Sequence, residues 1–176
     1  MEVPVLETER LILRGHGPGD LAACAAMWAD PIVVRHIGGR PFTREEVWSR
    51  LLRYAGHWEW LGYGYWAIED RATGEFVGEL GFADFHRDMT PSVEGIPEAG
   101  WVLAAKFHGR GYATEALQTV HTWGEANLVS TRTACIIDPA NAASIRVANK
   151  CGYIENGLAS YRGEPALLYF RSNQAA

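Results

Sequence analysis

The chain has 176 residues with a formal net charge of −5, and its mixture of 48% apolar and 21% charged residues is typical of a globular protein. The acidic charge argues against a nucleic-acid-binding protein, which usually presents a basic face, and it suits a cationic substrate only weakly. No apolar run approaches the length that spans a bilayer, and the first residues, MEVPVLETER, lack the basic start and apolar stretch of a secretory signal. We therefore expect one domain over residues 1–176, located in the cytoplasm, with no nucleic-acid or membrane partner.

Capping residues and apolar periodicity predict the elements of the first half of the chain. Asp20 can cap a helix, Pro31 suits a first helical turn, and Thr43 with Glu46 forms a capping box. Two strand-like runs on either side of a turn at Gly74 indicate a hairpin. In chain order we expect a strand at 10–14, helices at 21–28, from 31, and at 44–58, and paired strands at 63–69 and 76–85.

The second half is predicted to contain a strand, a helix and a strand, followed by another helix and a hairpin. In chain order we expect a loop at 87–97, a strand at 98–104, a helix at 112–127, a strand at 131–137, a helix at 142–151, and strands at 153–160 and 166–171. Two strands joined by a helix imply a local parallel pair, whereas the other strands are joined as hairpins. The sequence therefore predicts a mixed α/β sheet with helices on both faces.

The most informative segment is AGWVLAAKFHGRGYATEALQ at residues 99–118, where a strand leads through a glycine-rich turn into a helix. Gly109 and Gly111 let the backbone approach a ligand closely, and the free N–H groups of the turn converge at the helix N-terminus. This arrangement is typical of a phosphate site, to which Arg110 can add a direct contact. Alone, the pattern also fits a plain tight turn. It is neither a P-loop nor a dinucleotide fingerprint, because no Gly-Lys-Ser/Thr follows and Thr114 replaces the third glycine.

The turn KFHGRGYATEA resembles the acetyl-CoA pyrophosphate loop of the GNAT superfamily, whose pattern is Gln/Arg-x-x-Gly-x-Gly/Ala. Lys106, Gly109 and Gly111 occupy the pattern positions, with Lys106 in place of the usual Gln or Arg. Four further segments, in the family's order, resemble the branch that acetylates ribosomal-protein N-termini. They are LETERLILR at 6–14, YGYWAIEDRATGEFVGELGF at 63–82, the Glu98 to Trp101 segment, and the segment from Asn141 through Ser144 and Lys150 to Tyr153. The chain is thus identified, over nearly its whole length, as a member of the GNAT N-acetyltransferases.

The resemblance implies a GNAT acyl-CoA N-acyltransferase fold. This fold has a mostly antiparallel seven-stranded sheet whose fourth and fifth strands are parallel and splayed, with the pantetheine arm of acetyl-CoA between them. It also implies acetyl-CoA as cosubstrate, a primary amine as acceptor and direct attack on the thioester, and dimers are frequent in the family. The residues that the resemblance places at the cosubstrate are Trp101, Val102, Leu103, Lys106, His108, Gly109, Arg110, Gly111, Tyr112, Ala113, Asn141 and Ser144.

The catalytic groups follow from the same resemblance. Glu98 matches the family's glutamate at the start of the fourth strand and is expected to act as general base through water, with Glu79 on the neighbouring strand as the alternative. Either glutamate can also be an ordinary surface carboxylate. Ser144 matches a serine near the leaving sulfur, although an exposed helix serine is an equally simple interpretation. Tyr153 follows too late in the chain to serve as the acid.

Three points about the cosubstrate and acceptor sites are left open by the sequence. A backbone N–H near Val102 or Leu103 is expected to donate to the thioester oxygen, and Asn141 can contact pantetheine, cap a helix, or do both. The acceptor is a protein N-terminal amine or a small-molecule amine, such as an aminoglycoside, a polyamine or an amino-acid-like metabolite, unless the chain is a non-catalytic acetyl-CoA-binding module. The acceptor site is expected from residues 36–42, residues 87–97 and the final hairpin.

The cysteines and histidines follow no metal-ligand or disulfide pattern. Reduced and buried thiols are expected at three widely spaced positions, Cys24, Cys135 and Cys151. Solvated or hydrogen-bonded imidazoles are expected at three others, His16, His86 and His108. No metal site is therefore predicted. The clustered tryptophans either fill the core or line the substrate site, and they are Trp58, Trp60, Trp66 and Trp101.

Overall fold

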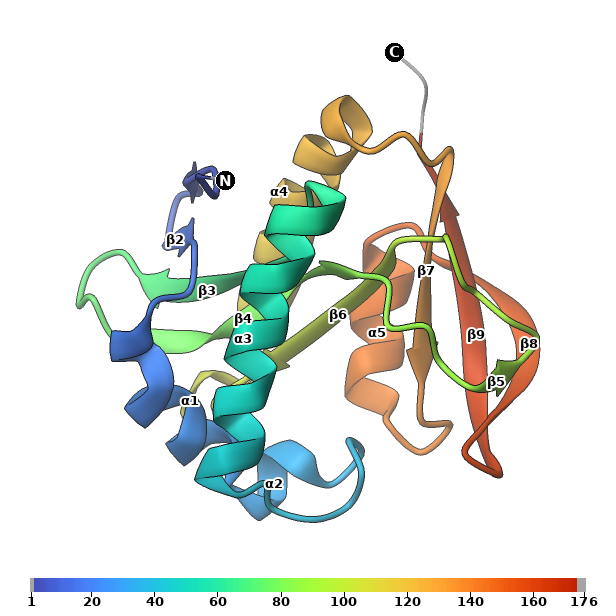
Figure 1. Ribbon diagram of the computed structural model, residues 1–176, viewed down its shortest axis with the longest axis horizontal. Coiled ribbons are helices and arrows are strands. Elements are labelled where there is room, and N and C mark those ends of the chain that lie inside the picture. Colours follow the sequence, from blue (N-terminus) through green and yellow to red (C-terminus); the bar gives the residue numbers. More distant parts are fainter. Residues whose placement is uncertain (1, 174–176) are drawn as a thin grey trace.

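A computed structural model describes residues 2–173 and shows a single mixed sheet of nine strands. Across the sheet the strands follow the order β1-β2-β3-β4-β6-β7-β9-β8-β5 (Figure 1). Their bounds are β1 Leu6–Glu7, β2 Leu11–Arg14, β3 Tyr65–Asp70, β4 Phe76–Ala83, β5 Met89–Thr90, β6 Glu98–Leu103, β7 Arg132–Ile137, β8 Ile154–Tyr161 and β9 Glu164–Ser172. The expected count of seven strands is corrected to nine, because β1 and β5 are two-residue strands that pair at β2 and β8 and carry little periodicity of their own.

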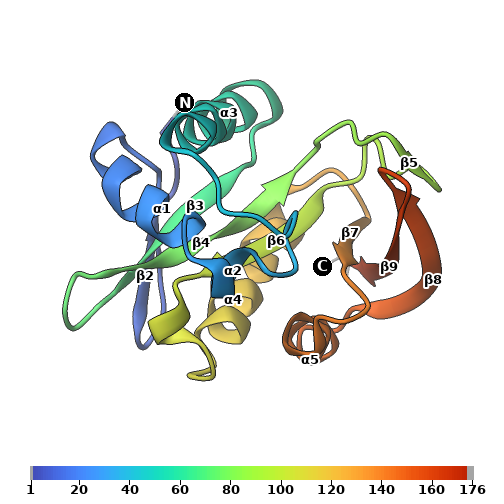
Figure 2. The same cartoon turned by 90° about the horizontal axis from the view of Figure 1, so that it is seen from below.

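Helices cover both faces of this sheet, as Figure 2 shows from below. One face carries α1 Leu21–Trp28, α2 Pro31–Val34 and α3 Arg44–Leu61, and the other carries α4 Tyr112–Asn127 and α5 Ala142–Lys150. Two short 3-10 turns, η1 Pro18–Asp20 and η2 Ala105–Phe107, precede α1 and α4. None of the helices in the described part of the chain is long and apolar enough to cross a membrane.

Local capping explains where most of these helices begin and end. The Thr43 hydroxyl accepts the Glu46 N–H at 3.2 Å, and the Glu46 carboxylate accepts the Thr43 N–H at 2.7 Å, so the predicted capping box is confirmed. Helix α3 runs on to Leu61, beyond the predicted end, and stops at Gly62 with φ +74°. The predicted cap at Asp20 is wrong, because its carboxylate binds the Arg14 guanidinium and the Gly17 N–H.

The period of two along β4 divides its side chains between the two helical layers. Leu80 and Phe82 belong to the main core, which includes the inner face of α4. Glu79 lies on the opposite face, where the Tyr54 hydroxyl of α3 donates to it at 2.6 Å. Tyr65 of β3 belongs to this second layer with the apolar residues of α1, α2 and α3. The layer under α1 to α3 therefore contains polar groups within an otherwise apolar core.

His121 of α4 is a buried histidine whose two ring nitrogens have no hydrogen-bond partner within residues 2–173. Burial, with a smaller effect from Arg171, lowers the pKa of His121 to about 3. In the unfolded chain this histidine takes up a proton near its ordinary pKa of about 6.5. Its contribution to the free energy of unfolding is therefore fully present above that pH, and it is lost as the pH falls towards the pKa of the folded state.

We therefore expect the free energy of unfolding of a His121→Phe variant to fall by about 2 kcal/mol less than that of the wild type between about pH 7 and about pH 5. Phenylalanine suits the site because Phe82 and Tyr153 surround the imidazole at ring-centroid distances of 5.5 and 5.3 Å. Urea unfolding at both pH values measures the difference. Equal acid sensitivity of the two proteins would show that His121 is not the titrating group.

Candidate active site

The parallel strands β6 and β7 touch at one end and then diverge. Their single registered pair is Glu98 opposite Ala134, and the Ala134 N–H donates to the Pro97 carbonyl at 3.0 Å. Beyond that point β6 continues to pair with β4 and β7 with β9, so each strand keeps one partner (Figure 1). The sheet therefore holds an opening between the carboxyl-terminal halves of two parallel strands, the place where open α/β sheets bind ligands.

The backbone of β6 presents alternate peptide groups to this opening. The Ala104 N–H donates to Val77 of β4, so the peptide groups of Val102 face β4 as well. The groups of Trp101 and Leu103 face the other way, and the Leu103 carbonyl accepts a hydrogen bond from His108 Nε2 at 2.8 Å. Of the two donors expected from the sequence, Leu103 and not Val102 is the one that faces the opening.

The glycine-rich turn lies at the same edge of the sheet and leads into α4. Gly109 and Gly111 have φ values of +75° and +80°, which other residues adopt with strain, and a Cβ at Gly109 would meet nothing within 4 Å. Gly111 is the N-cap and has no side chain to cap the helix, and the first bond of the turn runs from the Glu115 N–H to the Gly111 carbonyl. The N–H groups that precede Glu115 have no intrahelical acceptor, which makes this turn suited to an anion.

Arg10 holds this turn in place from the start of the chain. Its guanidinium donates to the Arg110 carbonyl at 2.9 Å and to the Glu115 carboxylate at 2.7 Å, and lies 4.6 Å from the centre of the Tyr112 ring. Sequence reasoning missed Arg10 because it is 100 residues from Arg110 and belongs to no motif. The predicted cosubstrate residue Lys106 forms an ion pair instead, with its Nζ 2.8 Å from the Oε1 of Glu75.

Other predicted cosubstrate residues are engaged through their side chains elsewhere. The Tyr112 hydroxyl donates to Asp70 at 2.8 Å, so Tyr112 offers the turn its amide alone. The Arg110 side chain is exposed, with its guanidinium 5.4 Å from the Phe107 ring. Ala113 lies half-buried in the first turn of α4. The turn therefore has main-chain donors within it and an exposed cation beside it.

The N-terminus of α5 follows β7 at the same edge. The Asn141 side chain accepts the Ser144 N–H at 3.1 Å, so the helix-capping role of Asn141 is confirmed. Ser144 lies half-buried in the first turn of α5. Asp138, just before this turn, contacts His36 at 2.8 Å and so joins the segment after α2 to the end of β7. Tyr153 is buried, with its hydroxyl 2.9 Å from that of Thr133, and so lies away from this edge.

Glu98 lies at the start of β6 on the face covered by α1 to α3. It is buried, and each of its oxygens accepts a hydrogen bond of 2.8 Å from Arg87. Burial, the largest single cause, disfavours the charge of Arg87, but the hydrogen bonds to Glu98 and the negative charge of Glu98 together raise the pKa of Arg87. The guanidinium also lies 4.5 Å from the Phe85 ring and 4.8 Å from the Tyr161 ring. The loop at 87–97 and the final hairpin therefore meet above Glu98.

Tyr65 places a hydroxyl group against the backbone of β6. Its ring stacks on Tyr54 at 4.5 Å, and a Cβ at Gly100 would lie 2.0 Å from the Tyr65 hydroxyl oxygen. Burial is the main cause that raises the pKa of Tyr65, so the hydroxyl keeps its proton. The glycine in the Glu-Ala-Gly-Trp segment is thus required by a side chain from β3, a contact that the sequence did not reveal.

Glu79, the second candidate base, is fully buried. Its Oε1 accepts hydrogen bonds from the Trp28 indole at 3.0 Å and the Tyr54 hydroxyl at 2.6 Å. The surface-carboxylate interpretation is therefore wrong for Glu79 and for Glu98. The two carboxylates differ in their hydrogen-bond partners. Glu79 accepts from neutral donors, whereas Glu98 accepts from a cation.

The remaining predictions from the sequence concern the cysteines, histidines and tryptophans. All three cysteines are free and buried, as predicted. His108 is hydrogen-bonded and His86 contacts Glu94 at 3.0 Å. The His16 side chain is only 5% exposed, and its ring nitrogens make no hydrogen bond of normal geometry within residues 2–173, contrary to prediction. Trp58 and Trp66 fill the core, whereas Trp60 is 87% exposed and belongs to neither predicted class.

Comparison with known proteins places these features in a family. The Acetyltransferase (GNAT) domain family matches residues 10–154. The uncharacterized N-acetyltransferase YoaA of Bacillus subtilis (strain 168) is 31% identical over 160 residues, covering 88% of this chain and 85% of YoaA. The structure of an acetyltransferase from Agrobacterium tumefaciens str. C58 is 28% identical with a TM-score of 0.82, covering 97% of this chain and 95% of that one.

A third relative shares the fold at lower identity. The ribosomal L7/L12 alpha-N-protein acetyltransferase RimL, in complex with coenzyme A, has a TM-score of 0.78 at 17% identity, covering 98% of this chain and all of that one. The divergent parallel pair, the uncapped helix and the family match together define the class: the chain belongs to the GNAT acetyltransferases. It is an acetyl-CoA-dependent N-acetyltransferase.

Proposed function

We propose that this chain forms one catalytic domain that binds acetyl-CoA across the edge shared by β6, α4 and α5 and acetylates the α-amine of a protein or peptide N-terminus. The observation that carries the proposal is the meeting of the β6–β7 opening with the uncapped N-terminus of α4. The amides of the turn would hold the pyrophosphate, and the opening would admit the pantetheine arm. The cosubstrate supplies the activated acetyl group.

Residues of this chain would bind and orient the reacting groups. The Leu103 peptide faces the opening, where its N–H would donate to the thioester oxygen as negative charge develops there. The Asn141 side chain would contact the pantetheine arm while it caps α5. Ser144, in the first turn of that helix, would donate a hydrogen bond to the leaving thiolate.

Glu98 is proposed as the general base, acting through water. Each of its oxygens uses one lone pair for Arg87, so a second remains for a water molecule. A free amine is needed for attack, and an α-amine, with a pKa of about 8, requires less assistance near neutral pH than a lysine amine at about 10.4. Glu79 is less suited to this role because the Trp28 and Tyr54 donors enclose it.

The N-terminal acceptor is supported by the resemblance of the sequence segments to the ribosomal-protein branch and by the fold shared with RimL, whose own substrate is an N-terminal amine of a ribosomal protein. The half-buried to exposed surface around the Arg87 loop and the final hairpin would receive it. A cytoplasmic location stays a prediction from the sequence, and a homodimer rests only on the family resemblance.

The proposal is tested by CoA release with matched amine acceptors. We expect turnover with peptides that carry a free N-terminus, and none with the same peptides after their α-amine is blocked, even where they contain lysine. Mass spectrometry would locate the acetyl group on the α-amine. Turnover confined to polyamines or aminoglycosides would favour a small-molecule enzyme, and tight acetyl-CoA binding without CoA release for any amine would favour a binding module.

A further inference from the structure

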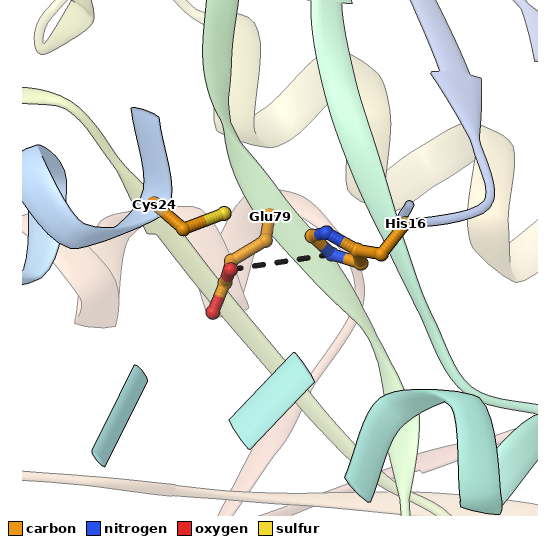
Figure 3. A group of neighbouring side chains, drawn as sticks. All are labelled: His16, Cys24 and Glu79. Carbon is orange, nitrogen blue, oxygen red and sulfur yellow. Dashed lines mark ion pairs between the residues drawn. The ribbon is translucent and has the colours of Figure 1, made fainter. Parts of the chain in front are cut away.

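Three side chains that sequence reasoning left unconnected meet beneath α1. His16 follows β2, Cys24 lies on α1 and Glu79 lies on β4, and Figure 3 shows them turned towards one another. One potential ligand atom from each residue lies within 4.8 Å of the other two. Only 5% of the His16 side chain is exposed, and Cys24 and Glu79 are fully buried. The cluster is thus enclosed within the protein.

Polar atoms in this cluster lack partners. Both ring nitrogens of His16 and the Oε2 oxygen of Glu79 are buried and make no hydrogen bond of normal geometry within residues 2–173. Buried polar groups are nearly always hydrogen-bonded, and each unmet group costs about 1–3 kcal/mol. Three such atoms in one place indicate that a further species belongs between them.

Polar groups lie next to two of these side chains. Asp20 Oδ2 lies 4.0 Å from His16 Nδ1, and Arg14 fixes the Asp20 carboxylate by bonds of 2.9 and 2.7 Å. The Oε1 oxygen of Glu79 is occupied by Trp28 and Tyr54, so Oε2 is the free one, 4.0 Å from His16 Nε2. Metal-binding histidines commonly have a carboxylate near the ring nitrogen that does not bind the metal, and metal-binding carboxylates commonly accept hydrogen bonds on their other oxygen.

We propose that His16 Nε2, Cys24 Sγ and Glu79 Oε2 bind a zinc ion. Histidine nitrogen, cysteine sulfur and carboxylate oxygen are the ligands that zinc takes in proteins, whereas magnesium and calcium require oxygen ligands. Binding transfers the Cys24 thiol proton to solvent. The resulting thiolate, the Glu79 carboxylate and the neutral imidazole then balance the two positive charges of the ion, which removes the cost of an unpaired buried charge.

The geometry is compatible with this ion after small side-chain movements. Tetrahedral zinc with ligands at about 2.0–2.3 Å places its donor atoms about 3.5 Å apart, so the present separations need only modest contraction. A cavity of about 500 Å³ has His16, Tyr54 and Tyr65 in its lining, while Cys24 and Glu79 lie behind it. An ion would therefore approach from the His16 side of the cluster.

The site revises the expectation of no metal. Its ligands come from a loop, a helix and a strand, so they show no short ligand spacing along the chain. The ion would join these elements behind the strand that pairs with β6, and it would commit Glu79 to metal binding. The proposal does not depend on the transferase assignment, and its test uses no acetyl-CoA.

The test is metal analysis of protein purified without a polyhistidine tag. We expect about one zinc ion per chain after dialysis, removed by a strong chelator together with a lowered thermal midpoint. Cobalt added to the metal-free protein should give an intense near-ultraviolet band from thiolate coordination. Cys24→Ser should abolish this band, while Cys135→Ser, which replaces another buried free cysteine, should retain it.

Two outcomes would overturn the proposal. Wild-type protein that takes up no stoichiometric zinc or cobalt, with a thermal midpoint indifferent to the chelator, would show that water fills the cluster. A thiolate band that survives in Cys24→Ser would place the metal elsewhere. If Cys24→Ser does not fold, His16→Asn provides the second variant, and the chelator measurement on the wild type decides by itself.

Discussion

Replacing Gly111 with valine is expected to weaken acetyl-CoA binding by about 100-fold or more while the sheet stays folded. Gly111 has φ +80°, a conformation that a β-branched residue adopts only with strain, so the turn before α4 would change shape. The loss of two charge-assisted hydrogen bonds between amides and phosphate, at about 1.5–3 kcal/mol each, accounts for that loss of affinity. Calorimetric titration with acetyl-CoA measures it.

A matched control separates backbone strain from loss of the site. Gly62 has φ +74° at the end of α3, and a Cβ there would meet nothing within 4 Å. Gly62→Val therefore introduces comparable backbone strain at a position remote in sequence from the glycine-rich turn. We expect Gly62→Val to lower the free energy of unfolding by an amount similar to Gly111→Val and to keep wild-type affinity. Unchanged affinity in Gly111→Val would remove the turn from the cosubstrate site.

The second large effect is expected at Glu98, where Glu98→Gln should reduce kcat by about 100-fold or more with little change in acetyl-CoA affinity. Glutamine keeps the shape of the side chain but cannot take a proton. Without an internal base the acceptor must lose its proton in solution, so the remaining activity should rise with pH towards the pKa of the amine, about 8 for an α-amine. Steady-state kinetics over a pH series with a peptide acceptor measure both effects.

The control for Glu98 is another glutamate paired with an arginine. Glu125 contacts Arg171 at 2.6 Å, and Glu125→Gln removes a comparable ion pair from the distal part of α4. We expect its pH profile and kcat to match the wild type. A steep loss of kcat in Glu79→Gln, with Glu98→Gln close to wild type, would assign the base to Glu79 and contradict our proposal.

The polar layer beneath α1 to α3 has a consequence for how the enzyme is built. Glu98 with Arg87 and the Tyr65 hydroxyl against Gly100 lie on the same face of β6, because residues two apart on a strand share a face. Glu79 lies opposite Val102 on the neighbouring strand and so shares that face as well. The layer that the acceptor would approach is thus held by hydrogen bonds rather than by apolar packing alone.

Local signals in the sequence predicted most of the helices and strands. The capping box at Thr43 and the glycine before Tyr112 mark helix starts by bonds within a few residues, and α4 spans the predicted residues 112–127. The same kind of reasoning failed at Asp20, because the Arg14 guanidinium competes for its carboxylate. Two-residue strands such as β5 also escaped, since they depend on a partner strand and carry too few residues for a period of two.

By itself, the sequence determined the order of the elements, the glycine turn at the start of α4 that is suited to an anion, and the family resemblance. These rest on short-range contacts, on backbone conformations that glycine permits and on the period of side chains. Only the tertiary structure decided that Arg10 anchors the turn, that Arg87 pairs with Glu98, that Tyr65 requires glycine at 100, and that His16, Cys24 and Glu79 meet. Each of these depends on distances between residues far apart in the chain, which packing of the sheet against its helices fixes and no local pattern encodes.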